Sequence, residues 1–178
     1  MYLRNPDPWN FACSSYESGR YETIIEAVGH RHYERALEPG CSIGVLTESL
    51  ARFCDHLDAL DISPTAVARC RERCRNLSNV TIRHGAVPES IPDGKFDLIV
   101  FSELGYYFGE NELDRLTARL ADKLWPGGSL LAVHWLGVST DHVLSGDRVH
   151  EILRSNPQFA IEGEQRFPAF RLDHLVRQ

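Results

Sequence analysis

The sequence predicts an α/β fold built on a mostly parallel β-sheet, and three observations indicate it. Short apolar runs alternate along the chain with segments of helical periodicity, which is the pattern of strand–helix–strand units. The run Leu130-Leu-Ala-Val133 is apolar on both faces, as expected of a central strand in such a sheet. The first apolar run ends in a turn with glycines at 40 and 44, directly before a helix-like segment, and such turns line ligand sites in parallel sheets.

The first half of the chain predicts one helix followed by alternating strands and helices. Apolar side chains at Tyr21, Ile24, Ile25 and Val28 follow the spacing of an amphipathic helix. After this helix, strands are expected over 35–38, 57–61, 80–84 and 97–102, and helices over 44–53 and 64–75.

The second half predicts two further helices and three further strands. A helix is expected over 110–124, with Leu113, Leu116, Leu120 and Leu124 on one face. Pro126-Gly127-Gly128 ends it, because proline disfavours helix in the residue before it and glycine releases the turn. The remaining elements are a strand over 129–135, a helix over 146–154 and strands over 159–166 and 170–176.

Length and composition predict one soluble domain. The chain has 178 residues, of which 43% are hydrophobic, enough to bury one core. The net charge of −6 opposes binding to nucleic acid, and the arginines of 69–75 are interpreted as a solvated helix face. No apolar run approaches the roughly 20 residues that cross a bilayer, and the N-terminus lacks the order of a signal peptide. We expect a cytoplasmic protein that binds neither nucleic acid nor membrane.

The five cysteines show neither C-x-x-C pairs nor zinc-finger spacing. Cys70 and Cys74 could share a helix face, but two ligands do not make a structural metal site. We expect reduced thiols that serve as small apolar residues, and no metal.

A small nucleoside-like ligand is expected at the turn that follows strand 35–38. Gly40 and Gly44 are spaced G-x-x-x-G rather than G-x-G-x-x-G, which favours a ligand smaller than a dinucleotide. The next strand ends on Asp61, the position from which an acid reaches a ribose diol. Two alternatives remain: the glycines form only a turn, and Asp61 is a helix N-cap before Ser63-Pro64.

The order of these parts resembles the class I S-adenosylmethionine-dependent methyltransferases. The resemblance covers 35–135 and rests on Glu38 with Gly40, then Asp61, Gly85-Ala86-Val87, Phe96–Ser102 and Leu124-x-Pro-Gly-Gly128. It implies a Rossmann-like fold with a seven-stranded, mostly parallel sheet, an antiparallel C-terminal strand and helices on both faces. It also implies S-adenosylmethionine as cofactor and S-adenosylhomocysteine as product.

The resemblance assigns cofactor contacts residue by residue. The turn from Glu38 to Gly44 would hold the methionine part, and Asp61 would bind the ribose hydroxyls. Many relatives carry an acid in the adenine loop where this chain has Ala86, so the adenine amine would be met by the backbone of Val87. Ile62 and Val87 would sandwich the ring, and Ser102 would complete the cofactor site.

A narrower resemblance is to the nodulation protein S (NodS) group, whose members methylate the free amine of a deacetylated glucosamine at the end of a chitin oligosaccharide. It rests on Asp7-Pro-Trp9, Tyr16-Glu17 with Arg20-Tyr21, Ser102–Tyr107, His134-Trp135 and Leu144–Glu151. It implies that Trp9 and Arg20 close over the cofactor, with the arginine paired to its carboxylate. The single domain then divides into an N-terminal cap segment and helix (1–30), the cofactor core (35–135) and an acceptor-side helix with two strands (136–178).

Methyl transfer needs chiefly a nucleophile placed in line with the sulfonium methyl, and no metal. An amine must be neutral to attack, so we expect Glu103 to orient it and His134 to take its proton. Tyr106, Tyr107, Trp135 and His150 are expected to line the acceptor pocket. The alternatives are that His134 is a satisfied buried histidine and that the tyrosines only pack.

Three other functions stay open at this point. They are O-methylation of a small hydroxylated metabolite, a non-catalytic cofactor-binding module and a nicotinamide-dependent oxidoreductase, of which the glycine spacing argues against the last. The acceptor is expected to be a small molecule, and the protein a monomer or a homodimer.

Overall fold

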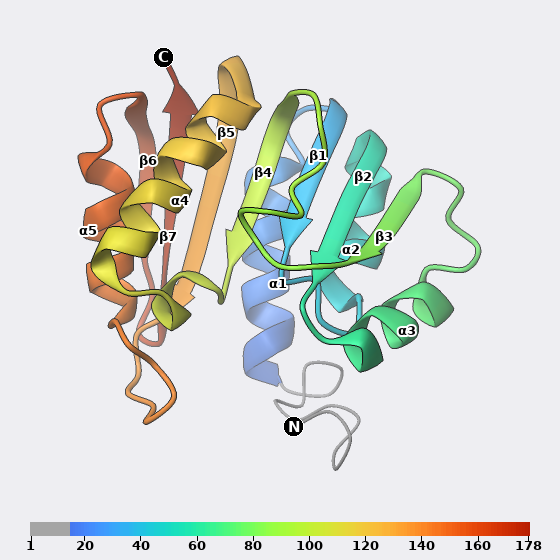
Figure 1. The fold of residues 1–178 in the computed structure, drawn as a ribbon, viewed down its shortest axis with the longest axis horizontal. Helices are drawn as coiled ribbons and strands as arrows, with labels where there is room; N and C mark the ends of the chain where they lie inside the picture. Colours follow the sequence, from blue (N-terminus) through green and yellow to red (C-terminus); the bar gives the residue numbers. More distant parts are fainter. Residues whose placement is uncertain (1–14) are drawn as a thin grey trace. The chain divides into compact units, whose positions relative to one another are not determined.

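The computed structural model describes residues 15–178 of the chain (Figure 1). The expected cofactor residue Trp9 lies outside the described residues. The contacts divide the chain into two compact units, Met1–Pro92 and Asp93–Gln178, and each is described by itself. The single domain over 1–178 stays a prediction.

The first unit holds three parallel strands in the order β3-β2-β1. They are β1 (Tyr33–Pro39), β2 (Cys54–Asp61) and β3 (Val80–His84). The helices of this unit are α1 (Ser15–Val28), α2 (Val45–Leu50) with a short 3-10 turn (Ala51–Phe53), and α3 (Pro64–Arg73). In the register, Leu37 lies beside Asp58 and Asp61 lies beside His84, so the carboxyl ends of β1, β2 and β3 lie at one edge of the sheet.

The second unit holds four strands in the order β4-β5-β7-β6. They are β4 (Phe96–Ser102), β5 (Leu124–Trp135), β6 (Phe159–Arg166) and β7 (Phe170–Arg177). β4 and β5 are parallel, whereas β7 runs antiparallel to both β5 and β6. With the three strands of the first unit, this gives the predicted seven-stranded sheet with one antiparallel strand near the C-terminus.

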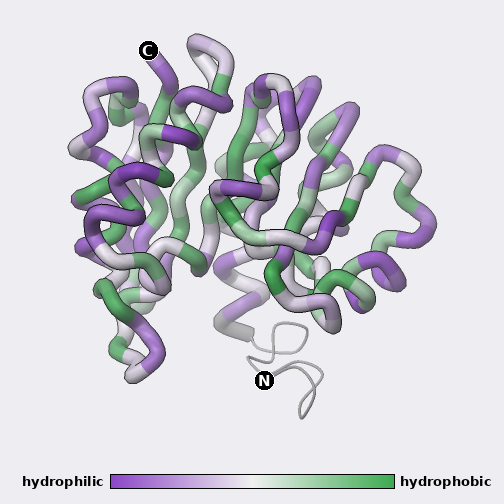
Figure 2. Tube along the Cα trace, in the orientation of Figure 1, coloured by the Kyte–Doolittle hydropathy of each residue, from purple (hydrophilic) through white to green (hydrophobic). Residues whose placement is uncertain are grey.

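Two helices cover strands of the second unit, α4 (Glu110–Lys123) and α5 (Gly146–Ser155). They contact one another, and both contact β5 (Figure 1). The predicted leucine face of α4 is confirmed, because Leu113, Leu116 and Leu120 are buried. β4 lies in this core and is coloured largely as hydrophobic in Figure 2, as its buried run Leu98–Phe101 requires.

Several predicted boundaries were wrong by a few residues, and the largest error is the start of β5. Leu124 is the first residue of β5 rather than the last of the helix, and it pairs with Phe96. The register between β4 and β5 then shifts between Phe96 and Leu98, and Gly127, at φ 79°, lies in the corresponding stretch of β5. The Pro-Gly-Gly segment therefore bends a strand instead of separating a helix from one.

None of the helices in the described part of the chain is both long and apolar enough to cross a membrane.

Candidate active site

The glycine turn after β1 depends on residues in left-handed conformation. Gly40, Ser42 and Gly44 have φ values of 80°, 49° and 83°, and the two glycines adopt this region without a Cβ penalty. The amides of Gly40 and Cys41 both donate to the Leu60 carbonyl, at 2.7 and 3.0 Å. The turn is therefore tied to the end of β2, where Asp61 follows.

Gly44 also permits a close approach between helices. A Cβ at this position would lie 2.7 Å from the Cys70 sulfur and 3.1 Å from the Cys70 Cα. Cys70 sits on α3 in an apolar cluster with Cys41, Ala59 and Cys74. The predicted reduced thiols are confirmed for the four cysteines that the structure describes, all of which are free and buried.

Asp61 fastens the turn to the start of α3. Its Oδ2 accepts the Ser42 amide at 3.0 Å and its Oδ1 accepts the Ser63 amide at 2.8 Å. Burial raises the pKa of Asp61, although these two amide hydrogen bonds act in the opposite direction. The alternative reading of Asp61 as the N-cap was wrong, because the N-cap is Ser63, whose hydroxyl accepts the Ala66 amide at 3.3 Å.

Glu38, near the end of β1, is a buried acid with an unused oxygen. Its side chain is 3% exposed, and burial raises its pKa to about 8, against a hydrogen bond from Thr47. Within residues 15–178 its Oε2 has no hydrogen-bond partner. A buried polar atom of this kind costs free energy unless a ligand satisfies it.

The predicted adenine loop follows β3. The Gly85 amide donates to the Asp61 carbonyl at 3.0 Å, which holds the loop beside the carboxyl end of β2. Ala86 and Val87 are half-buried, whereas Ile62 is 72% exposed. An exposed isoleucine beside this loop offers apolar surface to a flat ring.

Arg20 lies on α1 and is 1% exposed. Its guanidinium makes a very short ion pair with Glu17, one turn earlier. The expected pairing of Arg20 with a cofactor carboxylate stays a prediction. In this structure the same guanidinium is already paired with Glu17.

The acceptor candidates of the second unit gather after the end of β4. Ser102 is the last residue of that strand, paired with Val133, and its cofactor contact stays a prediction. Glu103 follows with φ 55°, which is uncommon for a residue with a long side chain. Its Oε1 accepts the Trp135 amide at 2.7 Å, and its Oε2 accepts the Tyr106 hydroxyl at 2.7 Å.

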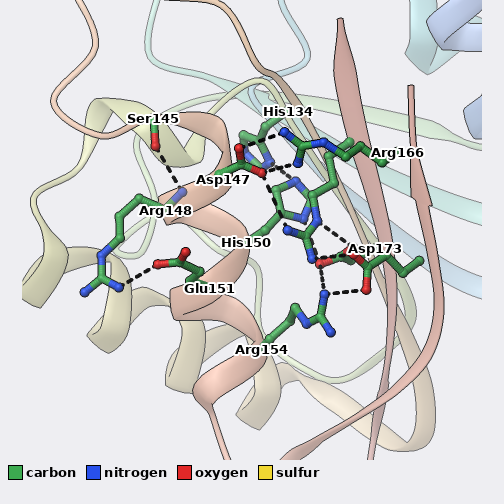
Figure 3. Close-up of polar contacts among 11 residues, drawn as sticks. His134, Ser145, Asp147, Arg148, His150, Glu151, Arg154, Arg166 and Asp173 are labelled. Atoms are coloured by element: carbon green, nitrogen blue, oxygen red, sulfur yellow. Dashed lines mark hydrogen bonds and ion pairs between the residues drawn. The ribbon is translucent and has the colours of Figure 1, made fainter. Parts of the chain in front are cut away.

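His134 does not present a nitrogen to an acceptor molecule in this structure. The side chain is fully buried; its Nε2 accepts the Gly105 amide at 3.0 Å, and its Nδ1 lies 3.3 Å from Nε2 of His150 (Figure 3). Both ring nitrogens are engaged, so the alternative of a satisfied buried histidine describes this geometry. His150 is also fully buried, which removes it from the wall of an open acceptor pocket.

A cluster of aromatic rings packs beside this segment. Tyr106 stacks on His142, with ring centroids 3.7 Å apart and planes at 15°. Tyr107 and Trp135 meet the same imidazole edge-on at 5.4 and 5.9 Å. Tyr107 is 42% exposed, and burial of the remainder raises its pKa. Among these, Tyr107 and the half-buried Trp135 are accessible to an acceptor.

Three residues that contact the predicted site residues or their buried partners were not predicted from the sequence. His142 lies in the loop of 136–145, which has no periodicity that would have singled it out. Arg171 and Asp173 are buried polar residues two positions apart on β7. Their alternation with apolar residues was the pattern from which a buried polar face of this strand could have been predicted. Over residues 15–178, no three histidine, cysteine, aspartate or glutamate side chains gather into a group that could hold a metal ion.

Strand order, glycine turn and the acid ending β2 together define the fold of class I methyltransferases. The nodulation protein S family model matches residues 2–130, and the chain belongs to this family.

Relatives and solved structures agree with that assignment. Nodulation protein S from Sinorhizobium fredii is 31% identical over 131 residues, which are 72% of this chain and 61% of that protein. Its counterpart from Rhizobium tropici is 32% identical over 72% of this chain and 55% of its own length. The matched part of the chain therefore spans less than two thirds of the length of these curated relatives.

Two solved structures cover nearly the whole chain. One, from Pseudomonas syringae and assigned as a methyltransferase, is 33% identical with a TM-score of 0.81, over 92% of this chain and all 100% of that chain. The second is the N-methyltransferase NodS from Bradyrhizobium japonicum in complex with S-adenosylhomocysteine. It is 24% identical with a TM-score of 0.86, over 98% of this chain and 94% of that one, and it shows the common fold.

Proposed function

We propose that the protein is an S-adenosylmethionine-dependent methyltransferase that methylates the amine of a small molecule, such as a deacetylated amino sugar. The observation that carries the cofactor assignment is the Asp61 carboxylate, which ties the glycine turn to the start of α3. Membership of the nodulation protein S family supports the same conclusion.

The donor residues of the first unit fit the chemistry of this cofactor. The half-buried Asp61 carboxylate, which accepts two amides, still has lone pairs for the two hydroxyls of a ribose. Glu38 Oε2, which has no partner among the described residues, offers an acceptor at the end of β1. A positively charged ligand group beside Glu38 would draw its raised pKa downward. When bound, S-adenosylmethionine supplies an electrophilic methyl group on a sulfonium.

The acceptor chemistry falls to Glu103 in this proposal. An ammonium ion has no lone pair, so it must lose a proton before it attacks. The Glu103 carboxylate is half-buried and already oriented by Trp135 and Tyr106. It can therefore accept an N–H of the amine, fix the direction of the nitrogen lone pair and take the proton.

The proposal gives His134 a different role from the one expected from the sequence. A general base must be within hydrogen-bond reach of the proton it takes. His134 is fully buried, and its Nε2 accepts a backbone amide. We therefore infer that His134 supports the acceptor segment and that it is not the base.

Transfer of labelled methyl from S-adenosylmethionine to a panel of acceptors tests the proposal. A chitin oligomer with one terminal amine freed should take up label, and its fully N-acetylated counterpart, the matched control, should not. Hydroxylated aromatics and simple amines complete the panel. Label found only in phenols would contradict the amine assignment.

A thermal-shift assay separates the cofactor question from the acceptor question. S-adenosylhomocysteine should raise the melting temperature by mass action, whereas NAD should not. The opposite pattern would overturn the assignment to methyl transfer.

A further inference from the structure

A buried chain of polar side chains continues from His134 across the second unit. His150 on α5 follows His134, and its Nδ1 lies 2.9 Å from Oδ2 of Asp173 on β7. The contact does not have the straight geometry of a hydrogen bond, so the carboxylate attracts a proton on Nδ1 through a bent contact. Figure 3 shows the two histidines and Asp173 following one another between helix and strands. The chain thus joins β7 to the Gly105 amide.

The Asp173 end of the chain is held by cations. Arg171 Nε donates to Asp173 Oδ1 at 3.0 Å, and an Arg154 nitrogen lies 3.7 Å from Oδ2. Burial raises the pKa of Asp173, but His150 and Arg171 outweigh it, and the pKa falls below its ordinary value. Asp147 on α5 also faces this cluster, 3.6 Å from Arg171. The chain therefore ends on an ionised carboxylate.

The other end of the chain has a fixed polarity. A backbone amide only donates, so Gly105 requires an unprotonated Nε2 on His134. Neutral His134 must then carry its proton on Nδ1 and donate it to His150 Nε2. His150 in turn carries its proton on Nδ1, facing Asp173. Both ends of the chain demand the same direction of donation.

We propose that His134, His150 and Asp173 form a one-way chain of polar contacts, in which each ring N–H faces the next acceptor, and that this chain positions the 103–107 segment of the acceptor site. Gly105 lies between Glu103 and Tyr106, whose side chains are hydrogen-bonded to one another. A fixed Gly105 amide therefore also fixes Glu103, the residue proposed to orient the amine. The positioning role of these residues rests on the proposed methyl transfer. The direction in which they donate their protons does not depend on it.

The substitution Asp173→Asn should reverse the direction of proton donation along the chain, and it leaves the volume of the side chain nearly unchanged. Arg171 Nε requires an acceptor oxygen, so the asparagine amide nitrogen would be turned toward His150. His150 Nδ1 would then have to accept, and His134 would be left with a proton on Nε2. That proton would oppose the Gly105 amide, as two donors face to face. Loss of a carboxylate behind a histidine has the same effect on the tautomer in serine proteases.

Imidazole nitrogen NMR on the ¹⁵N-labelled full chain measures the direction of the chain. Contacts to the Gly105 amide proton assign the His134 ring. In the parent, both histidines should be neutral with the proton on Nδ1, and the Gly105 amide should be protected from exchange. In Asp173→Asn the His134 proton should move to Nε2, and protection of Gly105 should fall by about tenfold or more, as one lost hydrogen bond implies. A parent His134 protonated on Nε2 would overturn the proposal, as would unchanged spectra in the variant.

Kinetics test whether the chain positions the acceptor. Asp173→Asn should lower kcat/KM for the amine by about tenfold or more, while affinity for S-adenosylhomocysteine stays within about twofold because Asp173 is not among the donor residues. Asp147→Asn is the matched control: it removes a carboxylate paired with Arg166 in the same cluster and should leave tautomers and kcat/KM unchanged. Unchanged kcat/KM in Asp173→Asn would overturn the positioning role. A parent that transfers no methyl group but has the expected tautomers would count against the proposed function alone.

Discussion

Glu103 accepts the backbone amide of Trp135 at 2.7 Å, and this hydrogen bond links the residue that follows β4 to the last residue of β5. The same carboxylate accepts the Tyr106 hydroxyl. Glu103 adopts a left-handed backbone conformation, with φ 55°, and strained backbone of this kind is found where function requires it. One side chain thus carries a structural role and the role proposed in catalysis.

Glu103→Gln separates these two roles. The amide oxygen still accepts from Trp135, and the amide nitrogen can donate to the Tyr106 oxygen, so the free energy of unfolding should change by less than about 1 kcal/mol. Without a carboxylate to take the proton, kcat/KM should fall by about 100-fold or more. Urea denaturation and methyl-transfer kinetics measure the two effects. Turnover within a few-fold of the parent would rule out the proposed proton acceptor, and Tyr106→Phe controls for loss of the hydrogen bond alone.

Gly44→Ala should destabilise the protein more than Gly127→Ala. Both glycines have positive φ, at 83° and 79°, so both substitutions incur the left-handed penalty of about 1 kcal/mol. Only at Gly44 does the new Cβ meet backbone, 3.1 Å from the Cys70 Cα, whereas nothing lies within 4 Å at Gly127. We expect a further loss of about 1–3 kcal/mol at Gly44 from overpacking. Equal midpoints of urea denaturation for the two variants would contradict the close helix contact.

The buried carboxyl group of Glu38 should make the stability of the first unit depend on pH. Its pKa rises from 4.5 to about 8 on burial, so between these values the folded chain binds a proton that the unfolded chain has released. The free energy of unfolding should therefore fall as the pH rises through this window. Glu38→Gln removes the titrating group and should flatten the dependence, leaving the variant more stable than the parent at pH 8 by on the order of a few kcal/mol.

Urea denaturation of both proteins at pH 5 and pH 8 measures this difference. Glu34→Gln, at an exposed position on the same strand, is the control and should follow the parent. Parallel pH dependence in the parent and in Glu38→Gln would show that Glu38 ionises normally when folded.

Local patterns predicted much of the fold, because strands and helices have their own periodicities. β3 and β6 begin and end at the predicted residues. The start of β5 was missed because Leu124 continues the leucine spacing of α4, while its pairing with Phe96 is a tertiary contact. Propensity and spacing do not report such a contact.

The site was predictable in its residues and not in their partners. Glu38, Asp61 and Glu103 stand out as acids at the ends of apolar runs. The bond from the Ser42 amide to Asp61 and that from the Gly105 amide to His134 join residues far apart in sequence. A histidine can serve either as a general base or as a buried hydrogen-bond acceptor. For His134, the Gly105 amide that it accepts decides between these two roles.

Calorimetric titration of S-adenosylhomocysteine into the parent, Asp61→Ala and Asp55→Ala tests the cofactor assignment most directly. Asp55 is an exposed acid on the same strand, where it pairs with His32, and its removal should leave the affinity unchanged. Loss of Asp61 removes the acceptor for the ribose hydroxyls and for the Ser42 and Ser63 amides, and it should weaken binding by about 100-fold, equivalent to about 3 kcal/mol. A folded parent that does not bind S-adenosylhomocysteine, or an Asp61→Ala variant that binds it as tightly as the parent, would contradict the account.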